Sequence, residues 1–304
     1  MTTRFASDRG LTRRMLLTTF LLGLLYVLFA AVLVALLRSA LLAVVIAGAL
    51  LFAQYWFSDR MALFAMHGRL VTPEEAPELH GVIDRLCALA DMPKPAVAVA
   101  DVDAPNAFAT GRSPSRAVVC ATTGLLRRLD AEELEGVLAH ELSHVAHRDV
   151  AVMTVASFLG VLAGLLTRFG LYAGLYGGGR GRNREGDNTA VAIMAVVAVS
   201  AVVYALSFLL TRALSRYREL AADRAAVLLT ARPAALAAAL TKVSGDMARI
   251  PTKDLRKAEA FNAFFFAPAV ASGFSLTSLF ATHPTLQQRL EQLAVLSREL
   301  GRAA

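Results

Sequence analysis

The segment HELSH places two histidines four residues apart and a glutamate directly after the first of them. These residues are His140, Glu141 and His144. Residues at i and i+4 lie on one face of an α-helix, so both imidazoles can bind one Zn²⁺ ion. The Glu141 carboxylate lies beside them, where it can take a proton from the water that attacks a peptide carbonyl. The motif therefore predicts a zinc-dependent peptidase with one Zn²⁺ per chain.

A catalytic zinc site requires a third protein ligand and keeps one position open. The metzincin arrangement would need Gly at position 147 and His at position 150, but the chain has His147 and Val150. Glu219, in the segment SRYRELAAD, is the predicted third ligand. Asp223 follows one turn later and can accept a hydrogen bond from a zinc-bound histidine. The alternative for Glu219 is a surface salt bridge with a neighbouring arginine.

The remaining histidines are weaker candidates. His283, in the segment ATHPT, is either a turn residue before a helix or a hydrogen-bond donor to the oxyanion that forms during hydrolysis. His147 fits a place beside the metal site better than a ligand position. His67 and His80 are interpreted as structural.

Long apolar blocks surround these motifs. The 304 residues are 56% hydrophobic and 18% charged, with a mean hydropathy of +0.54. Soluble domains contain about 25% charged residues, so this composition excludes disorder and disfavours an ordinary soluble enzyme. A helix of about 20 apolar residues can span a bilayer. The candidate spans are residues 15–37, 41–57, 150–167 and 189–210.

These blocks predict a multi-pass α-helical membrane protein. Residues 1–60 would form an N-terminal tail and a transmembrane hairpin, and residues 61–304 a metallopeptidase domain interrupted by a second membrane hairpin. A long buried helix is the alternative for residues 150–167. Four arginines precede the first block and only Arg38 follows it closely, which predicts a cytoplasmic N-terminus and active site at the cell membrane. The four arginines in the loop of the second hairpin argue against its full crossing.

The net charge and the cysteine content limit which partners, disulfides and metal sites can be expected. The net charge of +7 fits loops that face anionic lipid. No basic stripe interleaved with aromatic residues is present, so no nucleic-acid partner is predicted. Cys87 and Cys120 do not form a CxxC pair, which excludes a disulfide framework and disfavours a cysteine zinc site.

Between the apolar blocks, we expect a mainly α-helical domain with a small antiparallel β-sheet. Asp130 and Glu133 form a capping-box pattern that begins the helix carrying HELSH. No Gly or Pro occurs between HELSH and Gly160, so this helix is expected to continue into the third block. The other expected elements are a helix at 73–90, strands at 96–100, 106–110 and 117–122, and a final helix at 285–299.

Five motifs together resemble the HtpX family of membrane-bound zinc proteases, which is related to the CaaX prenyl endopeptidases. They are HELSH, SRYRELAAD, PNAFATG, TTGLL and LFATHPT, and the resemblance covers residues 70–300. It implies a gluzincin-type site in which His140, His144 and Glu219 bind zinc and Glu141 is the base. It also implies an edge strand that pairs with an extended substrate peptide, formed by Asn106, Ala107, Phe108, Ala109 and Thr110.

The resemblance further implies proteolytic quality control of misfolded membrane proteins under stress, at the cytoplasmic face of the membrane. The expected partners are membrane-protein or unfolded polypeptide substrates and the lipid bilayer, and no oligomeric state is predicted. One alternative is a processing peptidase of narrow specificity. Another is a non-enzymatic membrane scaffold with structural zinc, which is disfavoured because such zinc usually has four protein ligands.

Overall fold

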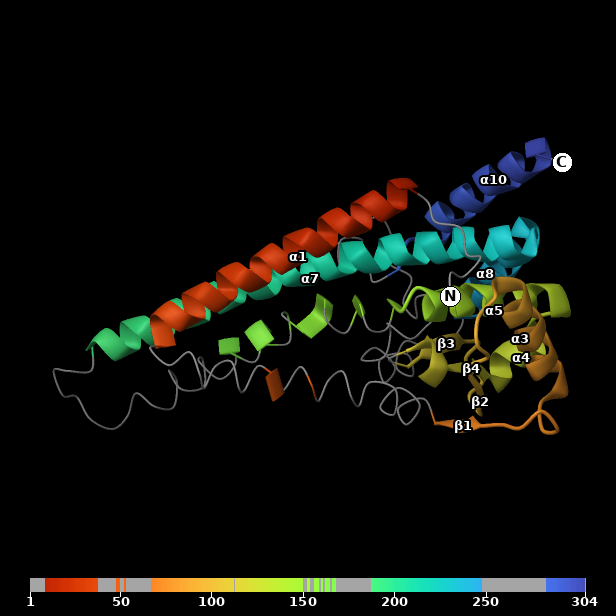
Figure 1. Ribbon diagram of the computed structural model, residues 1–304, viewed down its shortest axis with the longest axis horizontal. Coiled ribbons are helices and arrows are strands. Elements are labelled where there is room, and N and C mark those ends of the chain that lie inside the picture. Colours follow the sequence, from red (N-terminus) through yellow and green to blue (C-terminus); the bar gives the residue numbers. More distant parts are fainter. Residues whose placement is uncertain are drawn as a thin grey trace.

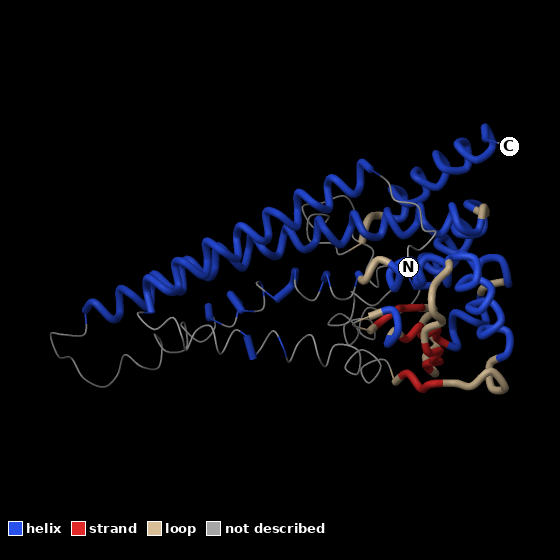
Figure 2. The backbone as a smooth tube through the Cα atoms, in the orientation of Figure 1, coloured by secondary structure: helices blue, strands red, loops and turns tan. Residues whose placement is uncertain are grey.

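Two long helices dominate the computed structural model. It describes residues 9–37, 67–111, 113–149, 187–247 and 283–303, with separate helical residues at 48, 49 and 52 and within 152–167. Helices α1 (Arg9–Leu37) and α7 (Asp187–Thr230) lie side by side along the long axis, and the strands and shorter helices gather at one end (Figure 1; Figure 2). The fold is therefore mainly helical, as predicted.

Helices α1 and α7 run antiparallel. Leu22 packs in one apolar cluster with Leu214, and Phe29 packs in another with Val203. Many of their other apolar side chains are exposed, with Leu16 65% and Met194 63% accessible. Both helices are long and apolar enough to cross a membrane, over Thr12–Ala31 and Met194–Thr230. The first and fourth apolar blocks are thus helical, as expected.

The described residues of the third block are helical and pack against α7 in the opposite direction. The Thr211 hydroxyl donates a hydrogen bond to the Ala156 carbonyl, at 3.2 Å. A Cβ on Gly160 would lie 3.3 Å from the Ser207 hydroxyl, so a small residue permits the close approach of the two helices here. The second block, 41–57, lies outside the described residues apart from three helical positions at 48, 49 and 52.

Among the described residues, the sheet contains four strands in the order β1-β2-β4-β3. They are β1 (Gly68–Leu70), β2 (Ala96–Ala100), β3 (Ala107–Thr110) and β4 (Val118–Thr122). The prediction of a purely antiparallel sheet is wrong, because β2 and β4 pair in parallel. After β2 the chain first forms β3 at the edge and then returns as β4 between the two, in the direction of β2.

The turn from β3 to β4 requires a glycine. Gly111 has a φ of 123°, and a Cβ there would lie 2.6 Å from the Ala117 Cα. A short 3-10 helix, η1 (Pro114–Arg116), completes the connection. Since β3 has no strand partner beyond β4 among the described residues, its outer backbone edge faces away from the sheet.

Helix α5 (Ala131–Ala146) lies at the centre of the domain. It packs against β3, α7, α3 (Pro77–Ala90) and α8 (Pro233–Met247), and α4 (Thr123–Arg128) precedes it. Leu138 and Leu142 of α5 are fully buried. Cys87 and Cys120 lie in the same core, where burial raises the pKa of their thiols to about 11 and about 12. Both are therefore buried free thiols, as predicted.

Both ends of α5 are defined by specific contacts. Asp130 and Glu133 form the predicted capping box, with hydrogen bonds of 2.9 and 3.0 Å. The expected continuation into the third block is wrong: α5 ends at Ala146, and Arg148 adopts a left-handed φ of 56°. That conformation costs roughly 1–2 kcal/mol for a residue with a Cβ. It directs Asp149 back toward α5, where two buried polar contacts offset the cost.

The C-terminal helix α10 (Leu286–Ala303) brings the last site residues into place. Its first turn is held by a capping box between Thr285 and Gln288, with hydrogen bonds of 3.1 and 3.2 Å. The Gln292 amide donates to the Leu220 carbonyl of α7, at 2.7 Å. These contacts fix His283, which immediately precedes the helix, against α7.

Candidate metal centre

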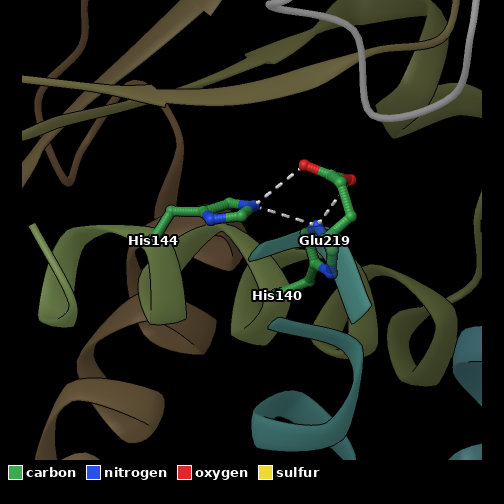
Figure 3. A group of neighbouring side chains, drawn as sticks. All are labelled: His140, His144 and Glu219. Atoms are coloured by element: carbon green, nitrogen blue, oxygen red, sulfur yellow. Dashed lines mark hydrogen bonds and ion pairs between the residues drawn. The ribbon is translucent and has the colours of Figure 1, made fainter. Parts of the chain in front are cut away.

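The two HELSH imidazoles face a glutamate from α7. Nε2 of His140 and Nε2 of His144 lie 3.2 Å apart. The two carboxylate oxygens of Glu219 lie 3.6 Å and 3.5 Å from these nitrogens. Figure 3 shows the three side chains converging on one point from two separate helices. The structure thus brings together the three residues predicted as metal ligands.

The donor set fits a tetrahedral zinc ion. Ligands at 2.0–2.2 Å with tetrahedral angles lie about 3.4 Å from one another, close to the three distances seen here. All candidate ligand atoms lie within 4.8 Å of one another. Two nitrogens and one carboxylate oxygen leave a fourth position for water or substrate. The geometry therefore suits a catalytic zinc site better than a structural one.

His140 is held from the inner side of the site. Its Nδ1 lies 2.9 Å from Oδ1 of Asp223, as the sequence predicted for this aspartate. Asp223 also accepts two hydrogen bonds from Arg289 of α10, at 2.6 and 2.7 Å. Burial alone would lower the pKa of His140, but its hydrogen bonds to Asp223 and Glu219 outweigh burial and raise it. Asp223 therefore fixes the ring so that Nε2 points at the metal position.

His144 is held from the other side by a residue that sequence reasoning missed. Its Nδ1 lies 2.6 Å from Oδ2 of Asp149, in the turn after α5. Asp149 also forms an ion pair with Arg218, the residue before Glu219 on α7. In a continuous helix, a residue five positions after His144 would lie on a different face. Only the break at Arg148 brings Asp149 to the histidine.

Glu141 lies between the candidate metal ligands and strand β3. It is 4% exposed, and its carboxylate accepts a hydrogen bond from the backbone N–H of Ala109. Burial raises the pKa of Glu141, while the charges of His140 and His144 oppose this effect. A buried carboxylate beside the metal position is suited to accept and return a proton.

The predicted substrate strand lies next to this carboxylate. Asn106 precedes β3, and its backbone N–H and C=O both bond to Thr122 at the end of β4. Along β3, Ala107, Phe108 and Thr110 are buried, and Ala109 is half-buried. The outer backbone edge of β3, rather than its side chains, is therefore the part that faces the site.

His283 lies at the site, whereas His147 and His80 do not. Nδ1 of His283 is 3.1 Å from Oε2 of Glu219, and the residue is 5% exposed. His147 donates a hydrogen bond through Nδ1 to the Ser143 carbonyl, at 2.8 Å, and so supports the end of α5. Nε2 of His80 lies 3.1 Å from the Val71 carbonyl, consistent with its structural interpretation.

Arg289 is the second site residue that sequence reasoning missed. It is 1% exposed, and its Nη1 lies 3.8 Å from Oε2 of Glu219. A signal was present in the sequence, because Arg289 occupies the apolar stripe of the last helix. That stripe consists of Leu286, Arg289, Leu293, Leu296 and Leu300. A charged residue at such a position points to a buried partner of opposite charge.

An HExxH helix that faces a glutamate from a second helix, with a buried carboxylate beside the pair, defines a metallopeptidase. A family model described as "Peptidase family M48" matches residues 73–297. The chain belongs to this family and is a metalloprotease, which rejects the interpretation as a non-enzymatic scaffold.

Relatives match over the whole chain. A Streptomyces coelicolor protein named "Protease HtpX homolog 1" is 68% identical over 303 residues, covering 100% of this chain and 98% of its own. A Moorella thermoacetica "Protease HtpX homolog" is 52% identical over 301 residues, covering 99% of both. The predicted resemblance is therefore confirmed. The crystal structure of S. mikatae Ste24p shares the fold, with a TM-score of 0.53 at 18% identity, over 94% of this chain and 67% of that one.

Proposed function

We propose that this metalloprotease is a multi-pass zinc endopeptidase of the cell membrane that cleaves misfolded membrane proteins at the cytoplasmic face. The observation that carries the proposal is the convergence of His140, His144 and Glu219 from two helices, one of which is apolar enough to cross a bilayer. Zinc is the metal that this family generally uses. When bound, it would polarise the scissile carbonyl and activate a water molecule.

The residues around the ligands then have separate tasks. The outer edge of β3, from Asn106 to Thr110, would pair with the extended substrate and align the scissile bond. Glu141 would take the proton from the attacking water and return it to the leaving amine. His283 would donate a hydrogen bond to the developing oxyanion. Asp223 would hold His140 so that its Nε2 stays directed at the metal.

Exposed apolar side chains on α1 and α7 support the membrane location, because these helices bury little of their surface within the chain. The proposed organisation is the hairpin of residues 1–60 followed by a peptidase domain, 61–304, that a second hairpin at 150–167 and 189–210 interrupts. Glu219 lies nine residues past the apolar block that ends at Leu210, or about 14 Å along α7. The cleft would therefore lie close to the membrane surface, within reach of loops of membrane proteins.

The test is Glu141→Gln in the full-length chain, purified in mild detergent. We expect cleavage of an unfolded membrane protein to fall by a factor of about 10²–10⁴. Metal analysis should still find one zinc per chain, because Glu141 is not a ligand. Glu132→Gln, at the exposed start of α5, is the matched control and should cleave normally. Wild-type cleavage by the Glu141 variant would contradict the assigned role. Cleavage products from several unrelated unfolded membrane proteins would separate broad quality control from narrow processing.

A further inference from the structure

The TTGLL segment, residues 122–126, joins the end of β4 to the start of α4. Thr122 is both the last residue of β4 and the N-cap of α4. Its hydroxyl accepts a hydrogen bond from the Leu125 N–H, at 3.2 Å, as an N-cap side chain does. The same hydroxyl makes two further hydrogen bonds, which capping alone would not require.

Both further hydrogen bonds of the Thr122 hydroxyl reach the chain just before β3. The hydroxyl donates to the Ala104 carbonyl, at 2.8 Å, and accepts from the Asn106 N–H, at 2.9 Å. Together with the bond from the Leu125 N–H, these use the one donor and both acceptor positions of a hydroxyl. Thr122 and Asn106 are both 0% exposed, so solvent is not in place to substitute for the hydroxyl.

The Thr122 hydroxyl takes the place of a backbone acceptor in the sheet. Two residues that form a hydrogen-bonded pair in an antiparallel ladder normally exchange two N–H···O=C bonds. The Thr122 N–H donates to the Asn106 carbonyl, at 2.9 Å, but the Asn106 N–H donates to the Thr122 hydroxyl. The carbonyl of an N-cap residue belongs to the helix that follows it. The side chain therefore completes the ladder where the backbone turns into α4.

This pair determines which backbone groups of β3 face outward. Hydrogen-bonded and outward positions alternate along an edge strand. Since Asn106 is bonded to Thr122, the residues of β3 whose backbone N–H and C=O point away from β4 are Ala107 and Ala109. The Ala109 N–H accordingly reaches the Glu141 carboxylate. The outward groups of β3 thus depend on a pairing that the Thr122 hydroxyl completes.

A second set of contacts holds residues 101–105, the loop that leads to β3. The Gly124 N–H donates to the Val102 carbonyl, at 3.0 Å. A Cβ on Gly124 would lie 1.9 Å from the Asp103 carbonyl oxygen, so only glycine permits this approach. Arg128, one turn further along α4, donates to the same carbonyl at 2.9 Å and forms an ion pair with the Asp103 carboxylate at 3.2 Å. The loop is therefore fixed to α4 shortly before β3 begins.

We propose that Thr122 is a positioning residue for the substrate, because its hydroxyl holds the outer edge of β3 in the arrangement with which a peptide pairs. The proposal rests on the role of β3 given under the proposed function. Pairing with an edge strand stabilises the bound substrate and the transition state alike, so a loosened edge should raise KM with little change in kcat. A residue that only stabilised the fold would change the fraction of active protein, and thus the apparent kcat, without changing KM.

The test compares Thr122→Val, which removes the hydroxyl, with Thr122→Ser, which keeps it. The full-length variants are purified in mild detergent and cleave a fluorescence-quenched octapeptide, selected from a peptide library by wild-type cleavage. We expect KM to rise roughly tenfold in Thr122→Val, with kcat within about twofold of the wild-type value. Thr122→Ser should restore a KM close to wild type. Metal analysis should find the same zinc content in both variants.

Ile83→Ala, in the core of α3, is the control for general destabilisation and should keep the wild-type KM. An unchanged KM in Thr122→Val would overturn the proposal. So would an equal rise in Thr122→Ser or in Ile83→Ala. If Thr122→Val does not fold, Arg128→Gln takes its place, since Arg128 is half-buried and holds the loop before β3. Its KM should rise by about threefold, and no rise would overturn the proposal.

Hydrogen exchange gives a readout that does not depend on cleavage. The backbone amides of residues 106–110 are followed in Glu141→Gln with and without Thr122→Val. We expect these amides to exchange roughly tenfold faster without the hydroxyl, because the bond from the Asn106 N–H is lost. Unchanged exchange would overturn the proposal and leave β3 as the substrate strand. Faster exchange with an unchanged KM would overturn it together with that assignment of β3.

Discussion

The two imidazoles of the HELSH segment are held by the same chemistry from opposite sides of the site. Nδ1 of His140 faces Asp223, and Nδ1 of His144 faces Asp149. Each carboxylate is also paired with an arginine. In both cases a hydrogen bond at Nδ1 leaves Nε2 free to point at the metal position.

The two supports differ in where their residues come from. Asp223 and Arg289 are contributed by α7 and α10, and their side chains are 0% and 2% exposed. They belong to the packed interior of the peptidase domain. Asp149 and Arg218 are 11% and 5% exposed and lie where α5 ends and the helical residues of the third block begin. We call Asp223 with Arg289 the inner support of the site, and Asp149 with Arg218 the outer support. The inner support therefore depends on packing within the domain. The outer support depends on how the apolar helices meet the domain.

This difference predicts separate roles for the two carboxylate–arginine pairs. The inner pair would make the metal site stable, because a buried ion pair that loses one partner leaves an uncompensated charge. The outer pair would tie the metal site to the arrangement of α7 and the third block. Three predictions test this separation of roles, and they follow in order of expected effect.

The largest effect is expected for Arg289→Met. This change removes both hydrogen bonds from Arg289 to Asp223 and leaves the fully buried carboxylate with the His140 imidazole. The free energy of unfolding of the metal-free protein should fall by about 3–5 kcal/mol. Chemical denaturation in detergent with a chelator would measure this.

Arg218→Met is the matched comparison for the inner arginine. It should cost less, since Asp149 keeps some access to water. Equal losses of stability in the two variants would remove the distinction between an inner and an outer support.

The convergence of the candidate metal ligands was predictable because it depends on local spacing and helix continuity. His140 and His144 follow from the i, i+4 rule, and Glu219 and Asp223 from the absence of a helix breaker after Thr189. The structure contains one helix, Asp187–Thr230, across that whole stretch. Where a periodic pattern runs unbroken, the sequence alone places side chains on a face.

The end of α5 was not predictable from local sequence. No Gly or Pro marks Arg148, and its left-handed conformation is stabilised by contacts of Asp149 with His144 and Arg218. Arg218 is 69 residues further along the chain. Contacts at this distance override local helix propensity, so the outer support was missed together with the turn that creates it.

Local sequence was also insufficient to predict how the strands of the sheet pair. The strands at 96–100, 106–110 and 117–122 were located to within one residue by their composition and turn signals. The prediction that they form an antiparallel sheet was wrong, because the insertion of β4 between β2 and β3 depends on pairing between strands and not on the strands themselves. β1, only three residues long, carried no alternating pattern to detect.

The second prediction concerns metal affinity at the inner support. Asp223→Asn keeps the size of the side chain and a hydrogen-bond acceptor for His140 but removes the negative charge. We expect zinc affinity to fall by about 10–100-fold, the usual cost of losing a carboxylate behind a zinc-bound histidine. Competition with a chromogenic chelator would measure it. Because the lost interaction lies inside the domain, the same loss is expected in detergent and in lipid bilayers. A different loss in the two media would contradict the assignment of Asp223 to the domain interior.

The smallest effect is expected for Asp149→Asn at the outer support. Its zinc affinity should fall by about tenfold, at the lower end of the same range, because the Asp149 side chain is 11% exposed, against 0% for Asp223, and water can replace part of its hydrogen bonding. The decrease should also depend on the medium. In the proposed arrangement a bilayer would constrain α7 and the third block, and so would keep Arg218 and the substituted side chain beside His144. We therefore expect a larger decrease in detergent than in bilayers, measured by the same chelator competition. If the decrease were equal in both media, or larger than that of Asp223→Asn, the outer support would be part of the domain interior, and the apolar helices would not reach the metal site through Asp149.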